Sequence, residues 1–258
     1  MSAILYEVKD HVAYVTLNRP EVLNCFNYAT LKELEETVED IHHNNDVRVI
    51  IFTGAGEKAF SAGADLKERR TLTESEVRRN VRKIRDVFSA VEALPQPTIC
   101  AINGHAFGGG FELALACDLR VSVREASMGL TELSWAIIPG AGGTQRLPRL
   151  IGQAKAMELI LTAKKMMAEE AFSYGILNQV TSREELMAVC ENYASLIMKN
   201  GPVAVQQAKY AIKYGSEVDL QTGLAIEAKA YEVTIPTKDR MEALVAFGEK
   251  RPPVFKGE

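Results

Sequence analysis

The chain opens with apolar and polar residues in alternation. ILYEV and VAYVTL alternate in this way on either side of residues 9–11, which predicts a β-hairpin. The spacing of the apolar residues then changes to that of a helix, with one side chain every three or four positions. This spacing predicts a helix whose buried face carries Leu31, Leu34, Val38 and Ile41.

Strands and helices alternate over the next hundred residues. VRVIIFTG, PTICAING and LRVSV are almost wholly apolar, as expected of strands covered on both faces. Thr73 and Glu76 form a capping-box pattern at the start of one helix, and FELALACD predicts a short second helix. The apolar stripe of the first helix consists of Val77, Val81, Ile84 and Phe88. This order of elements predicts an α/β fold with largely parallel strands.

The strand signals stop after about residue 200. Pro202 is expected at a helix start and Gly215 just after that helix ends, and TGLAIEAKAYEV continues the helical pattern. We therefore expect a core domain over residues 1–200 and a helical region over residues 201–258.

The composition narrows the class of protein. The chain has 258 residues, 47% of them hydrophobic, and a net charge of -4, which disfavours general binding to nucleic acid or anionic membranes. MSAILYEVKD does not resemble a signal peptide, and no apolar run is long enough for a membrane helix. The four cysteines are scattered, without a CxxC pair, and no HExxH motif occurs. We expect a cytoplasmic protein with reduced cysteines and no bound metal.

Three consecutive glycines, residues 108–110, stand where an apolar helix begins. They do not fit GxGxxG, because Leu113 occupies the last glycine position, and neither a P-loop nor GxSxG is present. A tight turn without a ligand remains one interpretation. The other is that free N–H groups at the helix start stabilise negative charge. A second glycine-containing segment, GEKAFSAGADLKE, could supply another N–H and complete an oxyanion hole.

Two glutamates lie in apolar surroundings near these loops. Glu112 stands among Phe111, Leu113 and Leu115, and desolvation there would raise its pKa towards the range useful for proton transfer. The alternative is an exposed glutamate in the first turn of a helix. Glu132, in GLTELSW, is either a second such group or a charge on a surface loop.

FSAGADLKE, NGHAFGGGFELALACD and MGLTELSWAIIPGAGGTQRLPR together resemble the crotonase superfamily, specifically the enoyl-CoA hydratases. The resemblance extends from LNRPEVLNCFN to EKRPPVFKGE, and VDLQTGLAIE with TIPTKDRMEALVAFGEKRPP is most similar to 3-methylglutaconyl-CoA hydratases. It implies a ClpP/crotonase-like spiral of ββα units with a C-terminal helical trimerisation region. A homo-hexamer, built as a dimer of trimers, is the expected assembly.

The resemblance also implies a role for each site residue. The N–H groups of Ala64 and Gly109 would hold the thioester oxygen of an acyl-CoA. Glu112 would deprotonate a water and Glu132 would protonate Cα, although two close carboxyls titrate as a pair, so that a shared or reversed division of these roles stays open. The remaining residues expected to contact the substrate or its CoA are Ala62, Asp65, Lys67 and Gly140. The reaction would be reversible addition of water across the 2,3 double bond, without a metal or separate cofactor, because coenzyme A is part of the substrate.

Several alternatives remain open. An enoyl-CoA isomerase of the same fold would often keep only one of the two glutamates, and a catalytically idle scaffold would not need either. Residues 67–85 carry eight basic and three acidic side chains, so this segment could bind RNA, attract CoA or be an ordinary solvated helix face. A methylglutaconyl group ends in a carboxylate that needs a cationic partner, and the sequence does not identify that partner.

Overall fold

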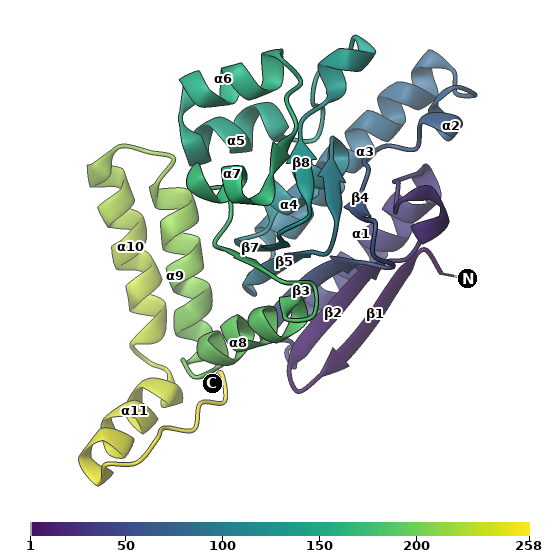
Figure 1. Cartoon of the computed structure of the whole chain (residues 1–258). Helices are drawn as coiled ribbons and strands as arrows, with labels where there is room; N and C mark the ends of the chain where they lie inside the picture. Colours follow the sequence, from purple (N-terminus) through teal and green to yellow (C-terminus); the bar gives the residue numbers. More distant parts are fainter. Residues whose placement is uncertain (1) are drawn as a thin grey trace. The chain divides into compact units, whose positions relative to one another are not determined.

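The computed structural model describes residues 2–258, and it contains two sheets together with helices (Figure 1). The larger sheet has the strand order β1(Ile4–Lys9), β2(Val12–Leu17), β3(Val49–Gly54), β5(Thr98–Ile102), β7(Leu119–Val123) and β10(Gln179–Thr181). The smaller sheet has the order β4(Ala59–Ser61), β6(His105–Phe107), β8(Ser127–Gly129) and β9(Met166–Met167). All neighbours in the larger sheet from β2 onward are parallel, as predicted.

The hairpin predicted at the start of the chain is present. Strands β1 and β2 are antiparallel and pair Ile4 with Leu17 at one end and Lys9 with Val12 at the other. The two turn residues, Asp10 and His11, both have positive φ angles of 49° and 65°. Two successive positive φ angles give a type I′ turn, whose twist matches that of the flanking strands.

The central part of the chain repeats a strand–strand–helix unit. In each of three successive turns, one strand joins the larger sheet and the next joins the smaller one: β3 and β4, then β5 and β6, then β7 and β8. The first two turns are followed by helices, and the third by the 3₁₀ turn η2(Glu132–Trp135) and a helix. The helix that follows the second turn, α4(Gly109–Ala116), contacts both β4 and β6 of the smaller sheet.

The helices that the sequence predicts are present near their expected positions, and the structure has further helices. Their bounds are α1(Tyr28–His43), α2(Leu66–Arg69), α3(Glu74–Ala93), α4(Gly109–Ala116), α5(Gly143–Ile151), α6(Gln153–Leu161), α7(Ala168–Ser173), α8(Leu186–Met198), α9(Pro202–Gly215), α10(Leu220–Thr234) and α11(Lys238–Glu249), with a further 3₁₀ turn η1(Pro20–Val22). The capping box of α3 forms as predicted, with both Thr73–Glu76 hydrogen bonds present. On the same helix, however, Val77 and Val81 are only half-buried, because they face a cavity rather than the core.

Two compact units make up the chain, and they divide between Glu191 and Asn192, inside α8. The sequence places this boundary at residue 200, after the helix. The second unit also includes Pro95–Pro97, and its helix α9 begins at Pro202 and extends through Gly215, one residue further than expected. Helices α9 and α10 pack against each other within this unit (Figure 1).

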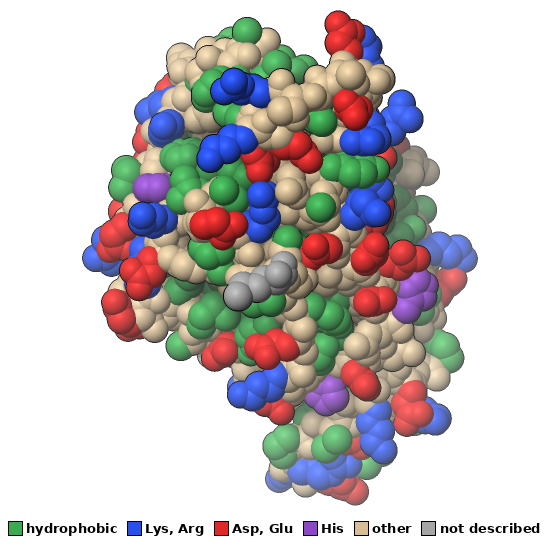
Figure 2. Space-filling model, turned by 90° about the vertical axis from the view of Figure 1, so that its right-hand side faces the viewer, with side chains coloured by type: hydrophobic (Ala, Val, Ile, Leu, Met, Phe, Trp, Pro, Cys, Tyr) green, Lys and Arg blue, Asp and Glu red, His purple; other side chains and the backbone are tan. Residues whose placement is uncertain are grey.

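The surface carries charges of both signs (Figure 2), and the cysteines are not paired with one another. Figure 2 shows acidic and basic side chains interspersed over the face that it presents, in keeping with the small net charge. All four cysteines are free thiols. Among the described residues, no helix combines the length and the apolar character needed to cross a membrane.

Candidate active site

A cavity of about 430 Å³ lies where the starts of α2 and α4 meet α3, η2 and the loop before α5. Six of the eight residues singled out in the sequence line it: Ala62, Ala64, Gly109, Glu112, Glu132 and Gly140. Its apolar wall comes from α3 and from the η2 segment: Val77, Val81, Ile84, Trp135, Ile137 and Ile138. The cavity thus combines a few polar groups with apolar walls, which is typical of a site for a small organic ligand.

Two glycines with positive φ angles shape the polar end of the cavity. Gly63 has φ of +92°, and a Cβ there would lie 2.8 Å from the Phe107 carbonyl oxygen and 3.0 Å from the Gly109 nitrogen. Gly108 has φ of +51°, and a Cβ there would lie 3.0 Å from Oε1 of Glu132. Any larger residue at either position would be strained and would crowd the groups that face the cavity. Glycine is therefore required here both for backbone conformation and for close approach.

Two backbone N–H groups are left available by this arrangement. Among the described residues, the N–H groups of Ala64 and Gly109 have no hydrogen-bond partner, although those of neighbouring Gly63 and Asp65 do. The segments are adjacent, because a Cβ on Gly109 would lie 3.8 Å from the Ala64 nitrogen. Two unpaired N–H groups from separate loops, at one end of a cavity, form the donor pair of an oxyanion hole.

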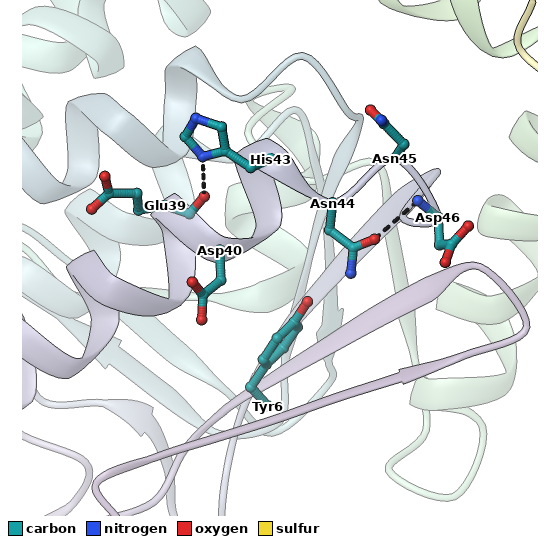
Figure 3. Close-up of a pocket in the computed structure, with 7 residues that line it drawn as sticks. All are labelled: Tyr6, Glu39, Asp40, His43, Asn44, Asn45 and Asp46. Carbon is teal, nitrogen blue, oxygen red and sulfur yellow. Dashed lines mark hydrogen bonds between the residues drawn. The ribbon is translucent and has the colours of Figure 1, made fainter.

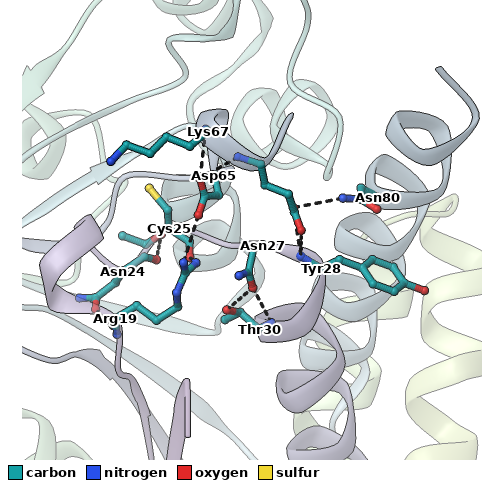
Figure 4. A network of polar contacts seen from close by, with 11 residues as sticks. Arg19, Asn24, Cys25, Asn27, Tyr28, Thr30, Asp65, Lys67 and Asn80 are labelled. Atoms are coloured by element: carbon teal, nitrogen blue, oxygen red, sulfur yellow. Dashed lines mark hydrogen bonds and ion pairs between the residues drawn. The ribbon is translucent and has the colours of Figure 1, made fainter. Parts of the chain in front are cut away.

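The loop that carries Ala64 is held by a network of polar contacts (Figure 4). The Asp65 carboxylate accepts hydrogen bonds from the N–H groups of Lys67 and Glu68 and forms a 3.1 Å ion pair with Arg19. Burial raises the pKa of Asp65, but these hydrogen bonds and the Arg19 charge outweigh it and lower the pKa overall. Asp65 and the exposed Lys67 do not line the cavity, so these contacts support positioning of the loop by Asp65.

Glu112 is buried in the first turn of α4, with 3% of its surface exposed. Its Oε1 atom accepts two hydrogen bonds of 2.8 Å, from the N–H groups of Ala141 and Gly143. Burial raises the pKa of Glu112, as its apolar neighbours in the sequence predict, and the two N–H donors and the charge of Arg146 oppose that rise. The second carboxylate oxygen is left for other contacts, and the side chain is held in one orientation.

Glu132, the first residue of η2, has a different environment. Its Oε2 atom is buried and has no hydrogen-bond partner among the described residues. Desolvation, followed by the negative charge of Glu112, raises the pKa of Glu132 to about 7. Glu132 is therefore a cavity residue with a buried carboxyl oxygen and not an ordinary charge on a surface loop. A carboxyl that holds its proton near neutral pH and faces a cavity can act as a general acid.

The sequence did not identify several other groups of the site. The N–H donors of Ala141 and Gly143 lie in IPGAGG, a motif in which the resemblance assigns a role to Gly140 alone. Arg69, at the end of α2, lines the cavity, but nothing in the sequence distinguished it from the other basic residues around it. For Trp135 the sequence favours simple packing but leaves a role in an acyl pocket open; the side chain is 62% exposed and lines the cavity. His105 does not line it; its Nδ1 accepts a hydrogen bond from the Ser127 N–H.

A second cavity, of about 750 Å³, is larger, but its lining is polar and acidic and so does not suit an acyl-CoA (Figure 3). It lies between β1 and the end of α1 and is lined by Tyr6, Glu39, Asp40, His43, Asn44, Asn45 and Asp46. Three acidic side chains there would repel a ligand that carries phosphates. No group of three or more His, Cys, Asp or Glu residues in the described part of the chain is arranged to hold a metal ion.

Fold and site together define an α/β enzyme in which a backbone oxyanion hole and two carboxyls face one cavity. The enoyl-CoA hydratase/isomerase family profile matches residues 7–258 of the chain. The Bacillus subtilis protein YngF is 54% identical over 99% of this chain and 98% of its own length. The human mitochondrial methylglutaconyl-CoA hydratase is 46% identical over 98% of this chain and 76% of its own length.

The solved structures agree. The crystal structure of an enoyl-CoA hydratase from Bacillus anthracis has a TM-score of 0.97 and 51% identity, with 99% of this chain and 100% of that chain covered. The chain belongs to the enoyl-CoA hydratase/isomerase family, has the crotonase fold, and is an enzyme of the hydro-lyase type. The resemblance noted in the sequence is confirmed, and the C-terminal helices fit the region through which such enzymes form trimers.

Proposed function

We propose that the protein adds water reversibly across the 2,3 double bond of an acyl-CoA thioester, and that Glu112 and Glu132 divide the proton transfers between them. The observation that carries this proposal is the contrast between the two carboxyls: Glu112 is fixed by two N–H donors, and Glu132 has a buried, unpaired oxygen and a pKa of about 7. Burial raises the pKa of both carboxyls, but the two backbone donors stabilise the ionised form of Glu112, so Glu112 is suited to the base role and Glu132 to the acid role.

The reaction follows from this division. The N–H groups of Ala64 and Gly109 hold the thioester oxygen, which draws electrons from the double bond and leaves Cβ electrophilic. The Glu112 carboxylate removes a proton from water as the water oxygen bonds to Cβ. The enolate charge then collapses as Cα takes the proton of the Glu132 carboxylic acid. Return of the proton from Glu112 to Glu132 restores the enzyme, and no metal or separate cofactor takes part.

The proposed substrate is 3-methylglutaconyl-CoA or a close analogue, which would place the enzyme in leucine degradation. The motifs of the C-terminal region and the 46% identity with the human methylglutaconyl-CoA hydratase support this substrate. We place the enzyme in the cytoplasm, where free thiols such as its four cysteines stay reduced. The proposed roles of Ala62 and Lys67 are contacts with the CoA portion of the substrate.

We also propose that the chain forms a homo-hexamer, as a dimer of trimers. The helices of the second unit expose large apolar side chains, including Ile212 (73%), Leu220 (78%) and Phe247 (86%). Apolar surface of this extent is typical of a face that is covered in the assembled protein. Light scattering coupled to gel filtration tests this proposal, because a monomer at micromolar concentration would contradict it.

RNA binding through residues 67–85 gains little support from the contacts. Arg78 pairs with Glu74, Lys83 with Glu35 and Arg85 with Asp86, and the guanidinium of Arg79 stacks on Tyr28 at 4.0 Å. These contacts leave less unpaired charge for nucleic-acid phosphates. We therefore do not include RNA binding in the proposed function.

The direct test is the loss of enoyl-thioester absorbance when the purified enzyme is mixed with crotonyl-CoA or 3-methylglutaconyl-CoA. A 3-enoyl-CoA is assayed in parallel, because its conversion to the conjugated 2-enoyl form measures isomerase activity. We expect hydration to exceed isomerisation. Isomerisation without hydration, or no turnover of any of the three thioesters, would overturn the proposal.

A further inference from the structure

The cavity contains a charged group that the hydration chemistry does not use. Among the described residues that line it, Arg69 is the one cationic side chain, and it is half-buried at the end of α2. The other lining residues are the two glutamates, Thr131 and groups that carry no charge. A half-buried guanidinium without a protein partner keeps its N–H donors available to an anion that enters the cavity.

Arg69 is also available for a ligand, unlike the other arginines near the site. Among the described residues, its guanidinium forms no hydrogen bond and no ion pair. Arg19 is engaged with Asp65 and with the Cys25 carbonyl. Arg146, whose charge acts on Glu112, is held by Glu92 and by the Ala141 carbonyl, each at 2.7 Å. Arg69 therefore faces the cavity as the unpaired member of this group.

The position of Arg69 indicates which part of a substrate it would meet. The thioester oxygen is placed by Ala64 and Gly109, so Cα and Cβ lie towards the two glutamates, and the rest of the acyl group continues beyond them. Arg69 and Glu132 line the same cavity, and the positive charge of Arg69 acts on the Glu132 carboxyl, so we place Arg69 on this side. Glu132 cannot be its permanent partner, because Oε2 of that carboxyl remains unpaired.

We propose that Arg69 is a specificity-determining residue that binds a carboxylate at the far end of the acyl group. This inference rests on the proposed function and names the cationic partner that the sequence alone did not reveal. An arginine fork binds a carboxylate through two parallel N–H···O bonds, which fixes both the charge and the direction of the acyl chain. The preferred substrates are thus 2-enoyl thioesters of the glutaconyl type. In these the double bond joins C2 and C3, and a second carboxylate stands at C5, two carbons beyond the double bond.

The other anion within reach of an arginine is a phosphate of coenzyme A. That contact would be the same for every acyl-CoA, whatever its acyl group. A comparison of two substrates that differ only at the end of the acyl chain therefore separates the two roles. Glutaconyl-CoA and crotonyl-CoA form such a pair, because both have an unbranched 2-enoyl group and only the first carries a terminal carboxylate.

The experiment measures kcat/KM for both thioesters, at one pH, with the wild type and with Arg69→Met, Arg69→Lys and Arg70→Met. Methionine keeps an extended apolar side chain of similar reach and removes the charge. Arg70 is the exposed neighbouring arginine and does not line the cavity, so its substitution controls for the loss of one positive charge from this segment. Both substrates are assayed at the same pH, so a change in the pKa of Glu132 affects both alike.

We expect the wild type to prefer glutaconyl-CoA, and Arg69→Met to lower the ratio of the two kcat/KM values by about 10- to 100-fold, the effect of losing a charge-assisted pair of hydrogen bonds. Arg69→Lys should restore part of the ratio, and Arg70→Met should leave it at the wild-type value. An unchanged ratio in Arg69→Met, whether both activities persist or both fall together, would overturn carboxylate recognition by Arg69. If the wild type hydrates neither thioester, the proposed function itself fails, which is a separate and distinguishable result.

Discussion

Glu112 and Glu132 face the same cavity with opposite hydrogen-bonding environments. Oε1 of Glu112 accepts two backbone N–H groups, and Oε2 of Glu132 is buried without a partner. The fixed carboxylate of Glu112 is one of the charges that raise the pKa of Glu132, after desolvation. The pair therefore favours a state in which Glu112 is ionised and Glu132 carries a proton, which is the state that water addition requires.

The pH dependence of the reaction should reflect this pair. Hydration needs the protonated form of Glu132, whose pKa is raised to about 7, so kcat/KM for crotonyl-CoA should fall as the pH rises through about 7. It also needs ionised Glu112, whose pKa is raised above its usual value, so activity should be lost again in acid. Initial rates between pH 4.5 and 9 measure both limbs. A rate that stays level up to pH 9 would contradict the role of Glu132 as the acid.

The unpaired carboxyl of Glu132 should also cost stability at high pH. Its folded-state pKa lies above the unfolded value, so the folded state holds the proton more tightly, and stability falls as the pH rises from about 4.5 through about 7. Glu132→Gln removes this charge. We expect it to stabilise the fold at pH 8 by about 1–2 kcal/mol, after allowance for solvent screening of a partly exposed group, with little change at pH 5.

Thermal unfolding of the wild type and Glu132→Gln at the two pH values measures that difference. The comparison between pH values separates the charge effect from any change in packing. Equal midpoints at pH 8 would show that the Glu132 carboxylate is solvated well enough to carry its charge without cost.

Gly63 tests the oxyanion hole. The Cβ of Gly63→Ala would press on the Phe107 carbonyl and on the Gly109 nitrogen, and the loop that carries the Ala64 N–H would have to move. Loss of one such donor typically lowers kcat by about 10²-fold or more. Gly175→Ala is a matched control, because Gly175 also has a positive φ of +78° but has no atom within 4 Å of its added Cβ. Steady-state rates with crotonyl-CoA for both variants provide the comparison, and equal kcat values would count against the role of this loop.

Much of the fold was predictable from the sequence because its signals are local. The hairpin around residues 9–11, the buried face of α1 and the capping box of α3 each depend on a short stretch of chain, and all three are present. The side-chain pattern of α3 was predicted less well. Val77 and Val81 have the spacing of core residues, but a cavity wall and a core have the same apolar periodicity, and only the packing of distant segments separates them.

In the candidate site, too, the groups carried by local motifs were predictable and the groups brought together by distant segments were not. The glycine-rich motifs predicted which loops supply N–H groups, since glycine is required where backbone must approach backbone. The partners of Glu112 could not be predicted, because Ala141 and Gly143 are 29 and 31 positions away and act through backbone atoms that any residue carries. Arg69 could not be predicted for another reason. It is one of eight basic side chains in residues 67–85, and no sequence feature shows which of them lacks an acidic partner.

The central claim, that two carboxyls act together on one water and one Cα, is tested most directly by kcat for crotonyl-CoA hydration in Glu112→Gln and Glu132→Gln. Each substitution keeps the side chain's size and removes its ability to exchange a proton. We expect each variant to lose at least about 10²-fold in kcat while it remains folded by circular dichroism. A folded Glu112→Gln or Glu132→Gln enzyme with wild-type kcat would contradict the account.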